Sequence, residues 1–259
     1  RLVGSEMCIR DRSYTYDQFG NITSVSKNGT VVESYEYDGL NQLVKVTNGA
    51  NVTEYAYDAG GNLTSVKLNG EVQDTYGYTD AGWKDLLTSF NGQAITYDEI
   101  GNPLAYRDGF TFTWQNGRRL ASVSKGTDAI SYTYDPDGIR TSKTVNGVTT
   151  QYHVMNGTLL GQTRGSDKII FLYDEKANKY GFDYNGTKYY YIFNVQGDVI
   201  GILNQSGTQI VSYQYDPWGK VLSVSGSEAS TIGQLNPIRY RGYYYDTETG
   251  FYYLCLLYT

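Results

Sequence analysis

The 259-residue sequence is poor in the residue types on which many enzymes and metal proteins depend. It contains one histidine, two cysteines, two methionines and four prolines. A single histidine excludes a histidine-based metal cluster. No Gly-x-Ser-x-Gly elbow, Gly-x-Gly-x-x-Gly motif or Walker A motif occurs. We therefore predict that the chain is not an enzyme and that it carries no catalytic, cofactor-binding or metal-binding residue and no cofactor.

Positive charge and long apolar runs are also scarce. The net charge is −6 and the isoelectric point is near 4.9, which argues against electrostatic binding to nucleic acid or to an anionic membrane. No apolar run is long enough for a transmembrane helix, and the first residues lack the apolar segment of a signal peptide. We therefore predict no nucleic-acid partner and no membrane span.

The two ends of the chain differ from everything between them. Within residues 2–12, LVGSEMCIRDR, the piece MCIRDR can be written ATGTGTATAAGAGACAG. Residues 255–259, CLLYT, can be written TGTCTCTTATACACA, which is the reverse complement of a stretch of the first string. Such inverted copies are typical of a translated sequencing adapter, so we predict that residues 1–12 and 255–259 are artefacts. Cys8 and Cys255 both lie there, which leaves the body without a disulfide or a cysteine metal site. If these end residues are artefacts, the lack of a signal peptide gives no information about secretion.

Tyrosine and glycine are abundant, with 28 and 30 copies. Tyrosine suits a half-buried pleated surface, because its ring packs across strands while its hydroxyl reaches water. Glycine supplies the positive φ that tight hairpin turns require. This composition predicts an all-β fold made of strands and turns.

A repeat organises these residues. Its copies are YTYDQFGNITSV from Tyr14, YEYDGLNQLVKV from Tyr35, YAYDAGGNLTSV from Tyr55, ITYDEIGNPLAY from Ile95, YTYDPDGIRTSK from Tyr132 and YQYDPWGKVLSV from Tyr213. In the first part of the chain the second tyrosine recurs every 19 to 21 residues, at positions 16, 37, 57, 78 and 97. A fixed period of this length indicates a repeat architecture.

Each copy predicts a strand, a turn and a second strand. The aspartate after the second tyrosine is placed to accept backbone N–H groups across the turn. A second turn, Asn-Gly, recurs between copies, at Asn28, Asn48, Asn69, Asn91, Asn146, Asn156 and Asn185. Asn-Gly between extended segments is a strong hairpin signal. The alternation of the two turns predicts a continuous antiparallel meander.

Several residues suggest chemistry but have a structural interpretation. The repeat aspartates are candidates for acid–base chemistry or calcium binding, yet their periodic placement favours turn capping; they are Asp17, Asp38, Asp58, Asp98, Asp135 and Asp216. His153 is expected to replace a tyrosine in a strand. Arg239 and Arg241 alternate with aromatic residues, which favours cation–π packing inside the sheet. Tyrosine ladders also suit sugar rings, so a carbohydrate-binding role stays open.

The repeats, the block YYYIFNVQGDVIGILN with YDPWG, and the segment RYRGYYYDTETGFYYL resemble bacterial YD-repeat proteins of the RHS family. The resemblance covers residues 14–254. It implies tandem hairpins in a spiralling antiparallel β-sheet shell, with YD/RHS repeats over residues 13–187 and degenerate repeats leading into a truncated RHS-associated core over residues 188–254. Family proteins continue into a self-cleavage site and a toxin, which we expect beyond Leu254.

The function that this resemblance implies is encapsulation. The chain would be a non-catalytic shell segment of a secreted or surface bacterial protein, and its partner would be the C-terminal polymorphic toxin domain of the same full-length protein, which it encloses and helps to deliver. The alternative is a cell-surface adhesion or carbohydrate-binding module, with surface glycans as partners.

Overall fold

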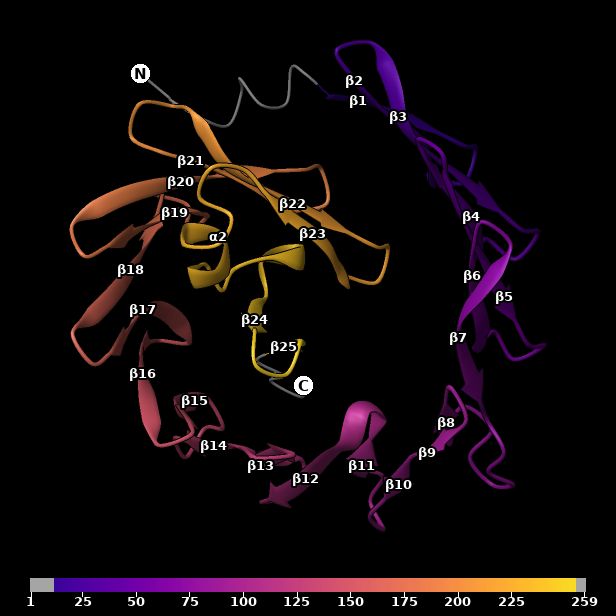
Figure 1. Cartoon of the computed structure of the whole chain (residues 1–259), viewed down its shortest axis with the longest axis horizontal. Coiled ribbons are helices and arrows are strands. Elements are labelled where there is room, and N and C mark those ends of the chain that lie inside the picture. Colours follow the sequence, from indigo (N-terminus) through magenta and orange to yellow (C-terminus); the bar gives the residue numbers. More distant parts are fainter. Residues whose placement is uncertain (1–11, 255–259) are drawn as a thin grey trace. The chain divides into compact units, whose positions relative to one another are not determined.

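The computed structural model describes residues 12–254, in two compact units that divide between Ile130 and Ser131. Antiparallel β-strands make up most of both units (Figure 1). The prediction of an all-β fold of tandem hairpins is therefore confirmed. Apart from Arg12, the adapter-like segments lie outside the described residues. Within the described part of the chain, no helix has the length and apolar character needed to cross a membrane.

The first unit is a meander in which strands pair in chain order, from β1 to β9 and again from β10 to β13. Its elements are β1 (Arg12–Tyr16), β2 (Ile22–Lys27), β3 (Thr30–Tyr37), β4 (Leu43–Asn48), β5 (Asn51–Tyr57), β6 (Leu63–Leu68), β7 (Glu71–Gly77), β8 (Ser89–Phe90), β9 (Gln93–Ala94), β10 (Thr96–Tyr97), β11 (Pro103–Tyr106), the 3-10 turn η1 (Arg107–Gly109), β12 (Phe110–Gln115) and β13 (Arg119–Lys125). Most strands are joined to the next by a short turn, whereas residues 78–88 form a longer connection between β7 and β8.

The second unit is a meander followed by a short C-terminal segment. After β14 (Asp128–Tyr134), the paired strands are β15 (Arg140–Val145), β16 (Val148–Met155), β17 (Thr158–Arg164), β18 (Asp167–Tyr173), β19 (Lys179–Tyr184), β20 (Thr187–Phe193), β21 (Val199–Leu203), β22 (Gln209–Tyr215) and β23 (Val221–Ser225). The segment that follows contains α2 (Ile232–Leu235), the 3-10 turn η2 (Tyr240–Gly242), β24 (Tyr244–Asp246) and β25 (Phe251–Tyr253). In Figure 1 this segment, in yellow, lies on the concave side of β16 to β23. We call it the core segment.

The Asn-Gly turns form as predicted, with one difference. In six of the predicted turns both residues have positive φ, near 50° for asparagine and 75° to 88° for glycine, as a type I′ turn requires. At Asn48 the hairpin forms but the asparagine ends β4 and pairs with Asn51. Gly49, with φ of 59°, is there the first central residue of the turn. Asn116-Gly117 adds a further turn with positive φ at both residues.

The aspartate turns bring a β-bulge with them. In the first hairpin Thr15 pairs with Ser24 but Tyr16 pairs with Ile22, so one residue of the second strand has no partner. The same shift precedes Tyr37, Tyr57, Tyr173 and Tyr215. Because a bulge increases strand twist, its recurrence in hairpin after hairpin adds twist at the same edge of the meander.

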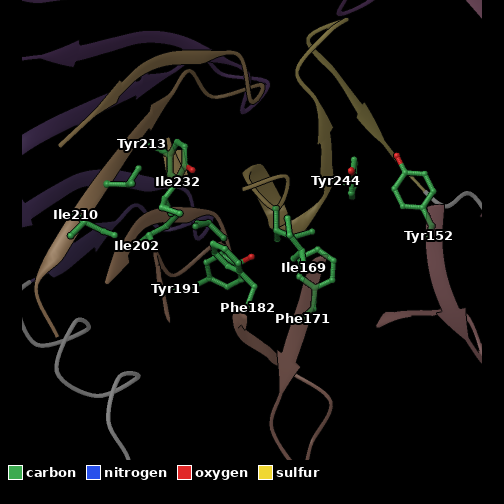
Figure 2. Packing of buried hydrophobic residues seen from close by; sticks show 13 residues of the cluster. Tyr152, Ile169, Phe171, Phe182, Tyr191, Ile202, Ile210, Tyr213, Ile232 and Tyr244 are labelled. Atoms are coloured by element: carbon green, nitrogen blue, oxygen red, sulfur yellow. The ribbon is translucent and has the colours of Figure 1, made fainter. Parts of the chain in front are cut away.

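The main buried cluster lies in the second unit, between the meander and the core segment. Phe182, Tyr191, Ile202 and Tyr213 come from successive strands and are each 5% exposed or less. Ile232 of α2 packs against this layer, and Figure 2 shows it close to Ile202 and Tyr213. Burial of these large side chains supplies the main driving force for this unit.

Candidate functional site

The repeat aspartates organise turns, as predicted. In the first copy Asp17 Oδ1 accepts the backbone N–H groups of Phe19 and Asn21, both at 2.9 Å, while the Asn21 amide donates to Asp17 Oδ2. Asp38, Asp58, Asp98 and Asp216 repeat the two backbone contacts. Amide N–H groups therefore occupy the carboxylate oxygens that a calcium site would use.

The same turn shifts the aspartate pKa in opposite directions according to burial. At the exposed Asp58, hydrogen bonds from the Asn62 side chain and backbone stabilise the carboxylate and lower its pKa. At Asp216, which lies deeper in the protein, desolvation outweighs the hydrogen bonds from Lys220 and Trp218 and raises the pKa. Both groups belong to turns, and neither faces a second carboxylate as a general acid–base pair would.

The second tyrosine of the repeat connects neighbouring hairpins. The hydroxyl of Tyr37 donates to the carbonyl oxygen of Ile22 at 3.0 Å, and that of Tyr57 to Leu43 at 2.8 Å. Equivalent bonds to an upstream carbonyl are made by Tyr78, Tyr97, Tyr173 and Tyr215. Each of these half-buried hydroxyls is thus close enough to the preceding hairpin to bond its backbone, a contact that the sequence pattern did not predict. Burial raises the pKa of these tyrosines, to about 12 at Tyr173.

Arg239 has the cation–π role predicted for it, although it lies outside the strands. It is 2% exposed, and its guanidinium lies 4.3 Å from the Tyr245 ring centroid and 5.2 Å from that of Tyr213. Arg241 stacks on Tyr240 at 5.3 Å but is part of the η2 turn, and its side chain is 39% exposed. His153 lies in β16, exposed, with Nε2 3.2 Å from Thr163 Oγ1.

A buried ionic cluster attaches the core segment to the meander. Asp246 at the end of β24 receives two hydrogen bonds from Arg140 of β15, at 2.6 and 3.2 Å, and one from Lys143 at 2.8 Å. Lys143 also donates to Glu248 at 2.7 Å. The side chains of Arg140, Lys143 and Asp246 are each 6% exposed or less. We refer to these four residues as the ionic cluster.

Aromatic rings enclose the arginine of the cluster. Its guanidinium carbon lies 4.2 to 5.2 Å from the ring centroids of Tyr132, Tyr152, Tyr244 and Tyr253. The Tyr253 hydroxyl also accepts the Arg140 backbone N–H at 3.0 Å. Desolvation alone would lower the pKa of Lys143, but the charge of Asp246 outweighs it and the pKa is raised. Both cations are thus held charged in a buried site.

Sequence reasoning missed this cluster, although the repeat contains its signal. Aligned on the tyrosines, Arg140 occupies the position of Ile22 in the first copy, and Lys143 occupies that of Val25, which is 5% exposed. A charge at a core position of a repeat requires a buried partner. Asp246 and Glu248 provide it from more than one hundred residues downstream.

The geometry of the cluster supports attachment. Every carboxylate oxygen of Asp246 faces a cation, and the four residues contain no nucleophile beside a base. A cavity of about 130 Å³ adjoins Lys143 and Glu248 and is also lined by Arg164 and Asp167. Among residues 12–254, no three histidine, cysteine, aspartate or glutamate side chains converge as metal ligands would.

Sequence comparison relates the chain to large bacterial proteins. A family model described as the teneurin YD-shell matches residues 13–255. The tRNA3(Ser)-specific nuclease WapA of Bacillus spizizenii is 40% identical over 180 residues, which is 66% of this chain and 8% of that protein. The tRNA nuclease WapA of Bacillus subtilis is 37% identical over the same shares. The chain therefore spans a small fraction of these relatives.

Solved structures share the fold at low identity. The complex of TcdB2 and TccC3 without the hypervariable C-terminal region matches 93% of this chain and 15% of that chain, with a TM-score of 0.75 and 19% identity. The Photorhabdus luminescens Tc holotoxin pore matches 93% of this chain and 14% of that chain, with a TM-score of 0.67 and 18% identity. This likeness confirms the antiparallel β-sheet fold.

The bulged aspartate turns, the tyrosine bonds between hairpins and the attached core segment together define a tyrosine-rich β-shell repeat protein. The chain belongs to the teneurin YD-shell family, and this match together with the WapA relatives confirms its resemblance to RHS/YD-repeat proteins. The Tc toxin structures share its fold.

Proposed function

We propose that this chain is a non-catalytic wall segment of a secreted or surface bacterial protein that encloses a C-terminal toxin domain and helps to deliver it. The observation that carries the proposal is the attachment of the core segment to the concave side of the second meander through the ionic cluster. A wall with such an internal attachment resists opening, because releasing the segment exposes the apolar cluster beneath it to water and breaks the hydrogen bonds of Asp246.

The chemistry of the repeats supports a structural role. Turn carboxylates bind backbone N–H groups, and tyrosine hydroxyls bind backbone carbonyls, so the polar groups that recur through the chain are engaged in holding hairpins together. The nuclease names belong to whole WapA proteins, of which this chain matches 8%. We place any toxic activity of the full-length protein outside the matched segment.

The test uses the natural gene that contains this sequence, sequenced to its end and expressed in full. Deleting residues 13–254 is expected to make the domain downstream of the repeats sensitive to a protease and toxic to the producing cell. The comparison is the intact protein, with the downstream domain detected by an antibody. A downstream domain that is cleaved equally in both proteins, or a gene that ends soon after the repeats, would overturn the proposal.

An adhesive or glycan-binding role is the second candidate. Tyr180 and Tyr190 stack with ring centroids 6.4 Å apart, and Tyr180 is 42% exposed, so the pair offers an aromatic platform to a sugar ring. A glycan array probed with the protein and with Tyr180→Ala tests this role. Tyr16→Ala, at an exposed tyrosine in the other unit, is the control. Binding that survives Tyr180→Ala, or no binding at all, contradicts it.

A further inference from the structure

A second cavity, of about 420 Å³, lies in the second unit between the turn before β19 and the core segment. Its walls include Lys179 at the start of β19, Phe193 at the end of β20, and Ile238 and Arg241 of the core segment. It shares no lining residue with the ionic cluster or with the cavity beside that cluster. Two cations and two large apolar side chains thus meet around one space.

Lys179 has no anionic partner within residues 12–254. Its ammonium nitrogen lies 4.9 Å from the ring centroid of Phe171 and 5.7 Å from that of Tyr173, both on the neighbouring strand β18. Desolvation lowers the pKa of Lys179 to about 8, in contrast to Lys143, whose pKa the nearby carboxylates raise. Ring faces alone compensate this half-buried charge, so an anion beside it would be strongly attracted.

Arg241 adds a second cation with open hydrogen-bonding capacity. Its backbone N–H donates to Asp198 Oδ1 at 2.8 Å, which fixes the position of the residue in the η2 turn. Its guanidinium donates to the carbonyl of Gln196 at 3.3 Å, and the Nε atom lies 3.7 Å from Asp198, beyond hydrogen-bonding distance. The guanidinium fork therefore retains donors for a planar oxyanion.

The surroundings strengthen this attraction. Phe193 and Ile238 form apolar walls of the cavity, and charges interact more strongly beside apolar surface than in open water. Asp198 is 4% exposed and accepts hydrogen bonds from Asn194 and from the Arg241 backbone. That carboxylate is consequently engaged behind Arg241, and it does not line the cavity.

We propose that this cavity is an oxyanion-binding site, in which Lys179 and Arg241 together hold a carboxylate or phosphate group. Arg241 would contact two oxygens of the anion through its planar fork, and Lys179 would act as a point charge on the opposite side. The anion has two possible sources that share this chemistry: an acidic side chain of a peptide, or a small free anion such as phosphate.

The test measures how anions protect Lys179 from acetylation. The full 259-residue chain is labelled with a trace of acetylating reagent at pH 7, and mass spectrometry gives the labelling rate of Lys179 relative to exposed Lys188. Without an added anion, Lys179 should react faster than Lys188, because more of it is neutral. Inorganic phosphate should slow Lys179 about tenfold for each pKa unit that the bound anion adds. Sodium chloride at equal ionic strength is the control.

Two further arms complete the test. A tetraglutamate peptide that protects Lys179 at lower concentration than phosphate would identify a peptide carboxylate as the ligand, and the reverse order would identify a free anion. Arg241→Gln should keep Lys179 reactive but abolish the protection. The proposal fails if phosphate and the peptide protect Lys179 no better than chloride does, or if Arg241→Gln leaves protection unchanged. The wild-type titration is decisive even if the variant does not fold.

Discussion

Individual tyrosines act in this protein through both the ring and the hydroxyl. The first tyrosine of a copy packs into the interior, as Tyr55, Tyr132 and Tyr213 do at 6% exposure or less. The second donates its hydroxyl to a carbonyl of the preceding hairpin, as Tyr57 does to Leu43. Phenylalanine would supply the ring but not the bond. The high tyrosine content therefore follows from two different requirements at each repeat.

Replacing a second tyrosine by phenylalanine tests the value of that bond. Tyr57→Phe removes the donor to the Leu43 carbonyl while keeping the ring, and should lower the free energy of unfolding by about 1 kcal/mol. Tyr16→Phe is the matched control, because Tyr16 is 53% exposed. Urea unfolding followed by tyrosine fluorescence measures both variants. Equal losses in the two would show that the hydroxyl bond contributes nothing specific.

The half-buried Asp216 should stabilise the protein more in acid than at neutral pH, the opposite of the usual behaviour of a carboxylate. Folding raises its pKa above the ordinary value of 3.8, so protonation of Asp216 favours the folded state. That contribution is present below the ordinary pKa and is lost as the pH rises through the raised one. Asp216→Asn should therefore match or exceed the wild-type stability at pH 7, with the difference falling in acid.

Asparagine already occupies this turn position elsewhere, since Asn194 and Asn204 each accept two backbone N–H groups in the same pattern. The turn should therefore accept Asp216→Asn.

Asp58→Asn is the opposite case. The pKa of Asp58 is lowered, so the stability that its carboxylate contributes is present above the ordinary pKa and is lost in acid. Thermal unfolding from pH 3 to 7 compares the variants. A fixed difference between Asp216→Asn and wild type at every pH would contradict the assignment.

At the level of strands, close backbone approach decides which residues a hairpin tolerates. Gly161 in β17 and Gly181 in β19 have ordinary φ but no room for a side chain. A Cβ atom would lie 2.4 Å from the Ile169 carbonyl oxygen at Gly161 and 2.2 Å from the Tyr189 carbonyl oxygen at Gly181. Adjacent strands must separate to accept it. Glycine here serves packing between strands, in contrast to its role in the turns.

Gly181→Ala should accordingly destabilise the second unit by about 1–3 kcal/mol, the usual range for overpacking. The control is Gly39→Ala, because a Cβ at Gly39 would meet no atom within 4 Å and its φ is not positive. Hydrogen exchange of the amides in β19 and β20 would locate the effect. Unchanged exchange and stability in Gly181→Ala would show that the strands adjust without cost.

At the scale of the whole molecule, a long-range ion cluster connects parts of the chain that the repeat does not relate. Asp246 is separated from Arg140 and Lys143 by more than one hundred residues. Such a buried pair costs desolvation energy, so its presence favours specificity of attachment more than stability. Among the repeat copies within residues 12–254, the copy with Arg140 and Lys143 carries cations at both core positions, and Asp246 pairs with both of them, which favours one register for the core segment.

Replacing one residue of the ionic cluster should lower stability more than replacing three of its residues by apolar ones. Asp246→Asn leaves Arg140 and Lys143 buried without their carboxylate and should lower stability by about 3–5 kcal/mol. The triple change Arg140→Ile, Lys143→Val and Asp246→Leu restores the apolar residues found at Ile22 and Val25, and should cost much less. Glu36→Gln, which breaks an exposed pair with Lys45, should have almost no effect.

Denaturant unfolding of the three proteins distinguishes these outcomes, and proteolysis within residues 236–254 reports release of the core segment. A triple variant as unstable as Asp246→Asn would show that the charges stabilise the fold directly.

The sequence by itself determined the local structure of this protein. Tyrosine spacing, the aspartate after each second tyrosine and the Asn-Gly pairs specify strands and turns through interactions within about twenty residues, and those elements form where they were expected. Even there, the asparagine at position 48 joined a strand, because Gly49 alone met the demand for positive φ.

Only the tertiary structure decided which distant groups meet. The partner of Arg140, the acceptor of each tyrosine hydroxyl and the space between Lys179 and Arg241 depend on how the chain returns to its own concave face. The repeat alignment shows that a cation lies at a core position, but it does not identify the carboxylate that pairs with that cation. Hydrogen bonding and desolvation act over a few ångströms in space, whereas a sequence pattern records separation along the chain.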